Sequence, residues 1–259
     1  MKIASVMFAL LPAVAWAGSF DGTWVTNGES IKVSGNPDTY LVANGTFSCD
    51  ACGTGLKLKA DGKDHKVKGH PYYDTASATV LDDQRVQTTT HAGTKLWGER
   101  THTVSADGKT MTEEFVSYEG PNPVKGKASY TRVAPAPAGA HALSGSWQLK
   151  ASGSTFPSEY LTVTFTETPG GLKMNSPLGQ SYDAKFDGKE YPIVGDTGKT
   201  KVSLKRIDDR TIQETDTRGG KVTDIVTYKV TPDGKIMRGV DDDKVHNNKM
   251  TYTAEKKSP

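Results

Sequence analysis

Two cysteines and two histidines in the segment CDACGTGLKLKADGKDHKVKGH have a spacing that could bind zinc. Cys49, Cys52, His65 and His70 follow the pattern C-x2-C-x12-H-x4-H, which is the ligand order of a Cys2His2 zinc finger. Such a finger needs a helix that presents both histidines on one face. The intervening ADGKDHKVKG instead contains an Asp-Gly turn pair and a further glycine. We therefore expect a hairpin here and not a zinc finger.

The start of the chain has the pattern of a secretory leader. Lys2 precedes an apolar run from Ile3 to Val14, and Ala15-Trp16-Ala17 forms an A-x-A cleavage site. Because the run is too short to span a bilayer, residues 1–17 are predicted to be a signal peptide. The mature protein is then expected to be exported, to the periplasm or the medium, without stable membrane insertion.

Export bears on the two cysteines, because oxidising compartments favour disulfides. A Cys49–Cys52 disulfide is therefore the leading expectation. Two alternatives stay open at this point: a metal site made of Cys49, Cys52, His65 and His70, or a redox function of the CxxC pair.

Composition and motifs argue against several classes of function. The formal charge is +2, and lysine and arginine alternate with acidic residues, so no basic tract is available for nucleic acid. The six histidines are scattered, and the sequence has no nucleophile elbow, phosphate loop or metalloprotease motif. We expect a binding protein rather than an enzyme, without a cofactor.

The chain contains a long internal repeat. FDGTW at residues 20–24 recurs as LSGSW at 143–147, and VSADGKTM at 104–111 recurs as VTPDGKIM at 230–237. Between the copies lies the Pro- and Ala-rich stretch APAPAGAHA, which has the composition of a semi-rigid linker. The repeat predicts a first domain at residues 18–133, a linker at 134–142 and a second domain at 143–259.

Each copy has the features of antiparallel β-structure. LTVTFTET, KVSLKRI and KVTDIVTYKV are short, alternating and rich in β-branched residues. The breaks between such segments contain Asp-Gly, Gly-Gly or Pro-Gly pairs, which suit tight hairpin turns. The predicted fold class is all-β, with two tandem antiparallel up-and-down barrels of roughly eight to ten strands each.

The residues that open the two copies resemble a known signature. Gly22-Thr23-Trp24 and Gly145-Ser146-Trp147 resemble the Gly-x-Trp motif of lipocalins and related calycin barrels. The DGK…VSADGKTM layout is similar to lipocalin-like domains of secreted bacterial proteins. The resemblance implies a barrel with a cavity for a small or lipid-like ligand, as in fatty-acid-binding barrels.

The same resemblance implies a structural role for three residues. In the family, the Trp closes the barrel floor and an Arg on the last strand packs across its ring. Trp24 and Trp147 hold the first position, and Arg132 holds the second in the first copy. The second copy has Ala254 there, with Lys256 and Lys257 beyond it.

Comparing the copies points to a binding site in the first one. By period two, one face of the second copy is expected to point into its barrel; this face consists of Val222, Asp224, Val226, Tyr228 and Val230. The aligned face of the first copy consists of Leu96, Gly98, Arg100, His102 and Val104. Two cationic side chains should therefore point inward in the first barrel. Ala76 and Ala78 also replace Val202 and Leu204, which would leave space for a ligand.

The resulting hypothesis is a protein that holds a small hydrophobic or amphiphilic molecule, possibly one with a carboxylate, in barrel 1. The proposed contacts are Arg100, His102, Tyr72, Tyr73 and Trp97, and the second barrel is expected to be mainly structural. The sequence does not determine the ligand's identity or the oligomeric state.

Other interpretations remain open. Arg100 could pair with Glu99, Glu113 or Glu114 at the barrel mouth, with His102 an ordinary core histidine. A register slip of one residue would turn both outward. The three aromatic residues could pack at a rim or an interface, and the pair of barrels could be an envelope interaction module with no small ligand.

Overall fold

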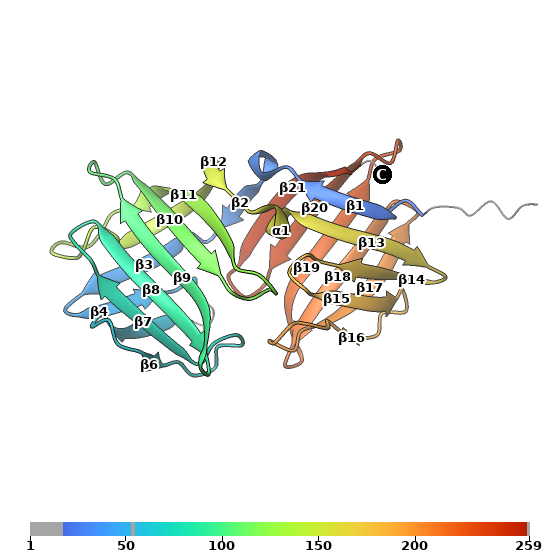
Figure 1. Cartoon of the computed structure of the whole chain (residues 1–259). Coiled ribbons are helices and arrows are strands. Elements are labelled where there is room, and N and C mark those ends of the chain that lie inside the picture. The colour runs from blue at the N-terminus through green and yellow to red at the C-terminus, as the bar shows by residue number, and fades with distance from the viewer. Residues whose placement is uncertain (1–17, 53–54, 258–259) are drawn as a thin grey trace, which may run out of the picture.

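The computed structural model describes residues 18–52 and 55–257, so the predicted signal peptide lies outside the described residues. The described chain forms two antiparallel sheets, each curled into a nearly closed barrel, and the barrels lie side by side (Figure 1). The predicted all-β, two-barrel fold is thereby confirmed. Within the described ranges, no helix is long and apolar enough to cross a membrane.

Barrel 1 is a ten-strand sheet. In order across the sheet, its strands are β5 (Leu56–Lys59), β4 (Thr46–Cys49), β3 (Asp38–Ala43), β12 (Gly145–Thr155), β11 (Val124–Ala134), β10 (Thr110–Ser117), β9 (Lys95–Val104), β8 (Arg85–Ala92), β7 (Thr75–Val80) and β6 (His65–Lys66). A bridge between Asp61 and Thr79 brings the two edges of the sheet together.

Barrel 2 is an eleven-strand sheet. Its main path is β15 (Ser181–Lys185), β14 (Gly171–Asn175), β13 (Thr162–Thr168), β1 (Gly22–Thr26), β21 (Asn248–Lys256), β20 (Ile236–Asp243), β19 (Lys221–Val230), β18 (Thr211–Arg218), β17 (Lys201–Asp208) and β16 (Tyr191–Pro192), and β2 (Lys32–Gly35) pairs with β21. Of the two short helices, η1 (Gly28–Ser30) joins β1 to β2, and α1 (Ser158–Leu161) lies on the segment that connects β12 of barrel 1 to β13 of barrel 2.

The first strand of each repeat closes the barrel of the other repeat. β1, which carries Trp24, pairs with β13 and β21 of the second copy. β12, which carries Trp147, pairs with β3 and β11 of the first copy. Accordingly, Trp24 is packed in the core of barrel 2 and Trp147 in the core of barrel 1.

This exchange corrects the predicted domain boundaries at 18–133 and 143–259. Barrel 1 is a continuous segment from β3 to β12, and it is inserted between β2 and β13 of barrel 2. The stretch 134–142, predicted to link two domains, instead runs from the end of β11 toward β12 within barrel 1.

The two Trp sites are so similar that sequence could not distinguish them. The indole Nε1 of Trp24 donates to the carbonyl of Phe20, and that of Trp147 donates to the carbonyl of Leu143, both at 2.8 Å. Either Trp-bearing strand could therefore make this bond in either barrel. The connections between strands in the folded chain decide which strand enters which barrel.

The exchange also changes the partner of Arg132. The resemblance implied that Arg132 would pack across Trp24, but its guanidinium lies 4.0 Å from the ring centroid of Trp147. It also donates to the carbonyls of Gly108, Ala142 and Ser144. Trp24 is instead covered by the Lys256 ammonium at 5.0 Å.

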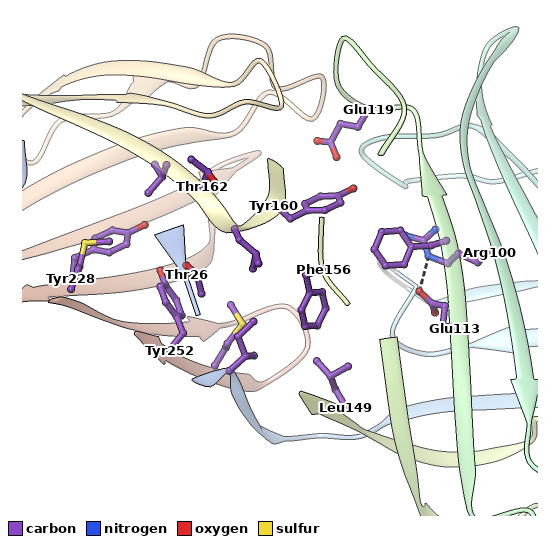
Figure 2. A pocket seen from close by; sticks show the side chains of 16 residues that line it. Thr26, Arg100, Glu113, Glu119, Leu149, Phe156, Tyr160, Thr162, Tyr228 and Tyr252 are labelled. Atoms are coloured by element: carbon purple, nitrogen blue, oxygen red, sulfur yellow. Dashed lines mark ion pairs between the residues drawn. The ribbon is translucent and has the colours of Figure 1, made fainter. Parts of the chain in front are cut away.

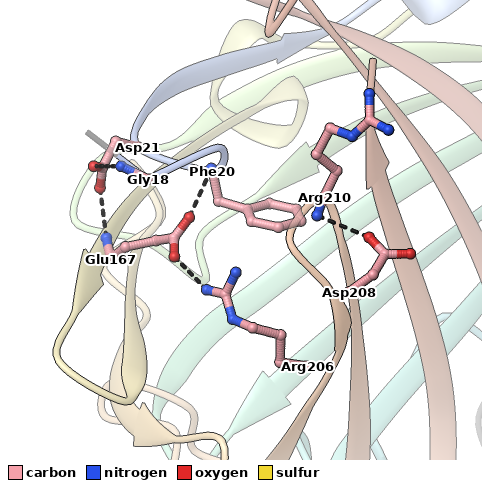
Figure 3. A network of polar contacts seen from close by, with 7 residues as sticks. All are labelled: Gly18, Phe20, Asp21, Glu167, Arg206, Asp208 and Arg210. Atoms are coloured by element: carbon pink, nitrogen blue, oxygen red, sulfur yellow. Dashed lines mark hydrogen bonds and ion pairs between the residues drawn. The ribbon is translucent and has the colours of Figure 1, made fainter. Parts of the chain in front are cut away.

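A polar network attaches the exchanged N-terminal segment to barrel 2 (Figure 3). The Glu167 carboxylate accepts from the amide of Phe20 at 3.0 Å and pairs with the guanidinium of Arg206. The amide of Glu167 donates in turn to Asp21 at 2.5 Å. Because one carboxylate joins the N-terminal segment, β13 and β17, the segment is fixed where β1 enters the sheet.

The inward-facing residues follow the predicted alternation along most of β9 and β19. His102 is buried on β9, and Val226 and Val230 are buried on β19. Val222, predicted to be on the same inward face, is 43% exposed. The pairing of β19 with β18 skips Thr223, so Thr223 is a bulged residue, and the alternation changes phase at Val222.

Candidate functional site

The five residues predicted to bind a ligand all line one cavity of about 490 Å³ inside barrel 1, called here the first cavity. β9 supplies Trp97, Arg100 and His102, and the segment between β6 and β7 supplies Tyr72 and Tyr73. Residues far apart in sequence are thus brought to the same space. Trp97 faces it because a register shift pairs Gly98 with Thr90 and Leu96 with His91, leaving Trp97 as the extra residue.

Arg100 presents to this cavity a guanidinium with few polar contacts. Its Nε lies 3.4 Å from Oε1 of Glu113 on the adjacent strand β10, and the arginine side chain is 47% exposed. Among the described residues its N–H groups have no hydrogen-bond partner, although a guanidinium offers five donors. Protein surrounds the group, yet solvent reaches it through the cavity. It is therefore available to an acceptor from outside the chain.

His102 is buried beside it with an unsatisfied ring nitrogen. The side chain is 2% exposed, and Nδ1 lies 3.5 Å from Oε2 of Glu113 without a hydrogen-bond partner among the described residues. Burial lowers the pKa of His102, Glu113 raises it and Arg100 lowers it further. An unpaired buried polar atom usually indicates a water or ligand site.

The aromatic residues of the first cavity divide into two groups. Tyr73 stacks on His70 with centroids 3.5 Å apart, and burial lowers the pKa of His70 to about 4. Tyr72 stacks on Trp97, while its hydroxyl accepts from Arg218 of barrel 2 at 2.5 Å. Tyr72 therefore also forms a contact between the barrels, as the interface alternative allowed.

The four candidate metal ligands are not arranged as a metal site. Cys49 and Cys52 are joined by a disulfide. His65 bonds to Asp61 at 2.7 Å, and His70 is stacked on Tyr73. Within the described ranges, no group of three His, Cys, Asp or Glu side chains could hold a metal ion. The metal alternative is therefore not supported by this geometry, whereas the predicted disulfide is present.

A second cavity of about 590 Å³ begins at the mouth of barrel 1 and reaches into barrel 2 (Figure 2). Its far end is lined by Tyr228, Met237 and Tyr252, which come from strands of barrel 2. The expectation that barrel 2 is mainly structural did not foresee this space. Comparison of the copies could not show it, because the space also depends on the segment that connects the barrels.

The two cavities share Arg100, Glu113 and Glu119, which we call the junction. Glu119 follows β10 and accepts from the side-chain amide of Gln180 in barrel 2 at 3.0 Å. Burial raises the pKa of Glu119. Glu113 was considered in the sequence only as an ion-pair partner, and its alignment with Gly239 was the signal that it is specific to barrel 1.

Barrel 2 contains a carboxylate layer that sequence reasoning missed. Burial raises the pKa of Glu214 to about 7, that of Asp216 to about 8 and that of Asp241 to about 7. The Tyr182 hydroxyl donates to Glu214 at 2.6 Å. These groups come from β18 and β20, which flank β19. The available signals were the alternate acids of QETDT and the run of three acids in VDDD.

None of the protein-family models, curated proteins or solved structures compared with this chain matches it.

Proposed function

We propose that this protein binds a small amphiphilic acid, with the acidic group held by Arg100 in the first cavity. The observation that carries the proposal is the junction, where a guanidinium with no hydrogen-bond partner among the described residues faces a hollow. A bidentate acceptor such as a carboxylate matches the fork of N–H groups on arginine. This is the lipocalin-like binding role that the Gly-x-Trp resemblance also implies.

The surrounding groups support an acidic head rather than a cation. His102 offers an unsatisfied nitrogen that can donate when protonated, and tyrosine hydroxyls of Tyr40, Tyr73 and Tyr130 belong to side chains that line the same cavity. Glu113 is the carboxylate paired with Arg100, so binding requires Arg100 to turn from Glu113 to the ligand. Asp38 and Glu119 also line the cavity and compete for the same cation. A proton taken up by His102 would then compensate Glu113.

The compartment belongs to the same proposal. We place the protein outside the cytoplasm, in the periplasm or the medium, because an A-x-A leader pattern precedes a chain with a disulfide. A binding protein that carries poorly soluble acids across an aqueous compartment fits this location.

The direct test is titration of the purified chain with alkyl carboxylates, read by tryptophan fluorescence. Trp24 and Trp147 are fully buried, so Trp97 at the mouth should report binding, and Trp97→Phe should remove the signal. Arg100→Gln should weaken binding about a hundredfold, since a charged hydrogen-bonding pair is lost.

The control for lost charge is Arg85→Gln, because Arg85 is exposed and pairs with Asp82 away from the cavity. The double variant Arg100→Gln/Glu113→Gln leaves the net charge of the junction unchanged and tests whether an unpaired Glu113 has disturbed the fold. If the wild type and Arg100→Gln bind equally, the carboxylate site is refuted.

A further inference from the structure

We propose that the bound amphiphile spans both barrels, with its head in the first cavity at Arg100 and its alkyl tail in the second cavity, toward the interior of barrel 2. This inference rests on the proposed function and adds the orientation of the ligand. It also assigns barrel 2 a direct part in binding.

The junction makes such a path available. Arg100 and Glu113 line both cavities, so a group bound to the guanidinium sits where the two spaces meet. Figure 2 shows Arg100 at one end of the second cavity and Tyr228 and Tyr252 at the other. A chain attached to the head can therefore extend either into barrel 1 or toward barrel 2.

The first cavity is a poor place for a hydrocarbon chain. Its lining includes His70, His102, Tyr40, Tyr130 and Asp38. Burial and the nearby Glu113 raise the pKa of Asp38 to about 6. A tail packed against these groups would remove water from them without replacing its hydrogen bonds, which is costly. A polar head would satisfy them.

The second cavity has the apolar surface that a tail needs. Leu149, Phe156, Leu161, Val163 and Met250 line it and are each only partly buried. They come from β12, the segment after it, α1, β13 and β21. An alkyl chain would cover these side chains and gain the free energy of apolar burial. The volume of about 590 Å³ lies within the usual range for small-molecule sites.

The charged groups on either side favour one orientation. The junction offers the Arg100 guanidinium to an anionic head, which must compete there with Glu113 and Glu119. Barrel 2 instead carries the acidic groups Glu214 and Asp241, whose pKa burial raises to about 7. An anionic head near them would be repelled as they lose their protons, whereas the same head at Arg100 meets a cation.

Chain length provides the first test. For wild type, affinity for saturated carboxylates from hexanoate to hexadecanoate should rise about tenfold for each added pair of methylenes until the second cavity is filled. Met250→Trp, which fills part of the second cavity, should remove the rise in affinity for the longer acids. Thr88→Leu, a matched enlargement in the first cavity, should leave the slope with chain length intact.

Cross-linking provides a second test on the unmodified protein, so it does not depend on any variant folding. An alkyl acid with a terminal diazirine should label peptides containing residues 149–163 or 250–252. Labels confined to residues 40–56 or 88–102 would overturn the orientation and leave the acid-binding function standing. Failure of wild type to bind any of the acids would overturn both.

Discussion

The two barrels were built from one repeat, and they differ most in the charges inside them. β9 of barrel 1 carries Arg100 and His102, while β19 of barrel 2 carries Val226 and Tyr228 at the aligned positions. On the preceding strand it is barrel 2 that carries the charged residue, because Glu214 of β18 aligns with the neutral Thr88 of β8. Barrel 1 therefore carries an ion pair, Arg100 with Glu113, beside His102, whereas barrel 2 carries acidic groups at other positions of the repeat.

This difference shows which positions of the repeat are constrained by packing and which are free to change. The Trp that closes each barrel makes the same 2.8 Å bond to a carbonyl four residues earlier. By contrast, Arg100 and His102 differ in charge, size and partner from the aligned Val226 and Tyr228. The Trp end of each barrel is therefore constrained by packing, whereas the positions near the junction have diverged.

The largest expected effect concerns the cation over each Trp. Arg132→Ala should destabilise the protein by about 3 kcal/mol, because it removes a stacked contact and leaves three backbone carbonyls without a donor. Lys256→Ala should cost about 0.5 kcal/mol, since the ammonium at 5.0 Å makes a weaker contact with Trp24. Chemical denaturation measures both, and equal losses would contradict the comparison.

An intermediate effect is expected from Glu113, which has no counterpart at Gly239. Glu113→Gln should strengthen binding of an alkyl sulfonate about tenfold, because Arg100 no longer pairs with a carboxylate of the protein. The sulfonate keeps its charge between pH 6 and 8, so ligand ionisation does not enter. Calorimetric titration measures the change, and weaker binding in Glu113→Gln would refute this role for the pair.

Repeating the sulfonate titration at several pH values measures the protons that the protein itself takes up on binding. In wild type, the anion displaces Glu113 from Arg100, and a proton on His102 compensates it. Since burial and Arg100 lower the pKa of His102 in the free protein, binding should take up a proton and weaken as pH rises. Glu113→Gln should remove most of that dependence.

The smallest expected effect is a pH dependence of stability caused by barrel 2. Folding raises the pKa of Glu214 and Asp241 to about 7 and that of Asp216 to about 8. Between pH 6.5 and 8 the folded chain therefore holds protons that the unfolded chain has released. Stability should fall as pH rises through this range. His70 and His102, whose pKa values are lowered, oppose this fall only near pH 6.5, because unfolded histidines lose their remaining protons there.

Thermal unfolding at several pH values measures this slope. The variant Glu214→Gln/Asp216→Asn should flatten it, because these two groups hold their protons through burial and mutual repulsion. A melting temperature that rises from pH 6.5 to 8 would show that the carboxylates are not buried in their acid form.

The internal repeat made much of the site predictable. Alternation on a strand is a local property, so aligning Arg100 and His102 with inward-facing Val226 and Tyr228 was enough to expect both in the interior. The same logic failed at Val222, because Thr223 bulges from β19 beside it and shifts the alternation. It also missed the carboxylate layer, which combines Glu214 and Asp216 of β18 with Asp241 of β20, and β19 separates these two strands.

The sequence by itself determined the β-structure, the duplication and the inward direction of Arg100 and His102, because turn chemistry and period-two alternation act within a few residues. The tertiary structure alone decided which Gly-x-Trp strand closes which barrel, since both slots offer the same indole bond and the difference in energy lies in how the chain connects them. It also decided that Arg100 lies between two cavities, because that position depends on segments contributed by both barrels.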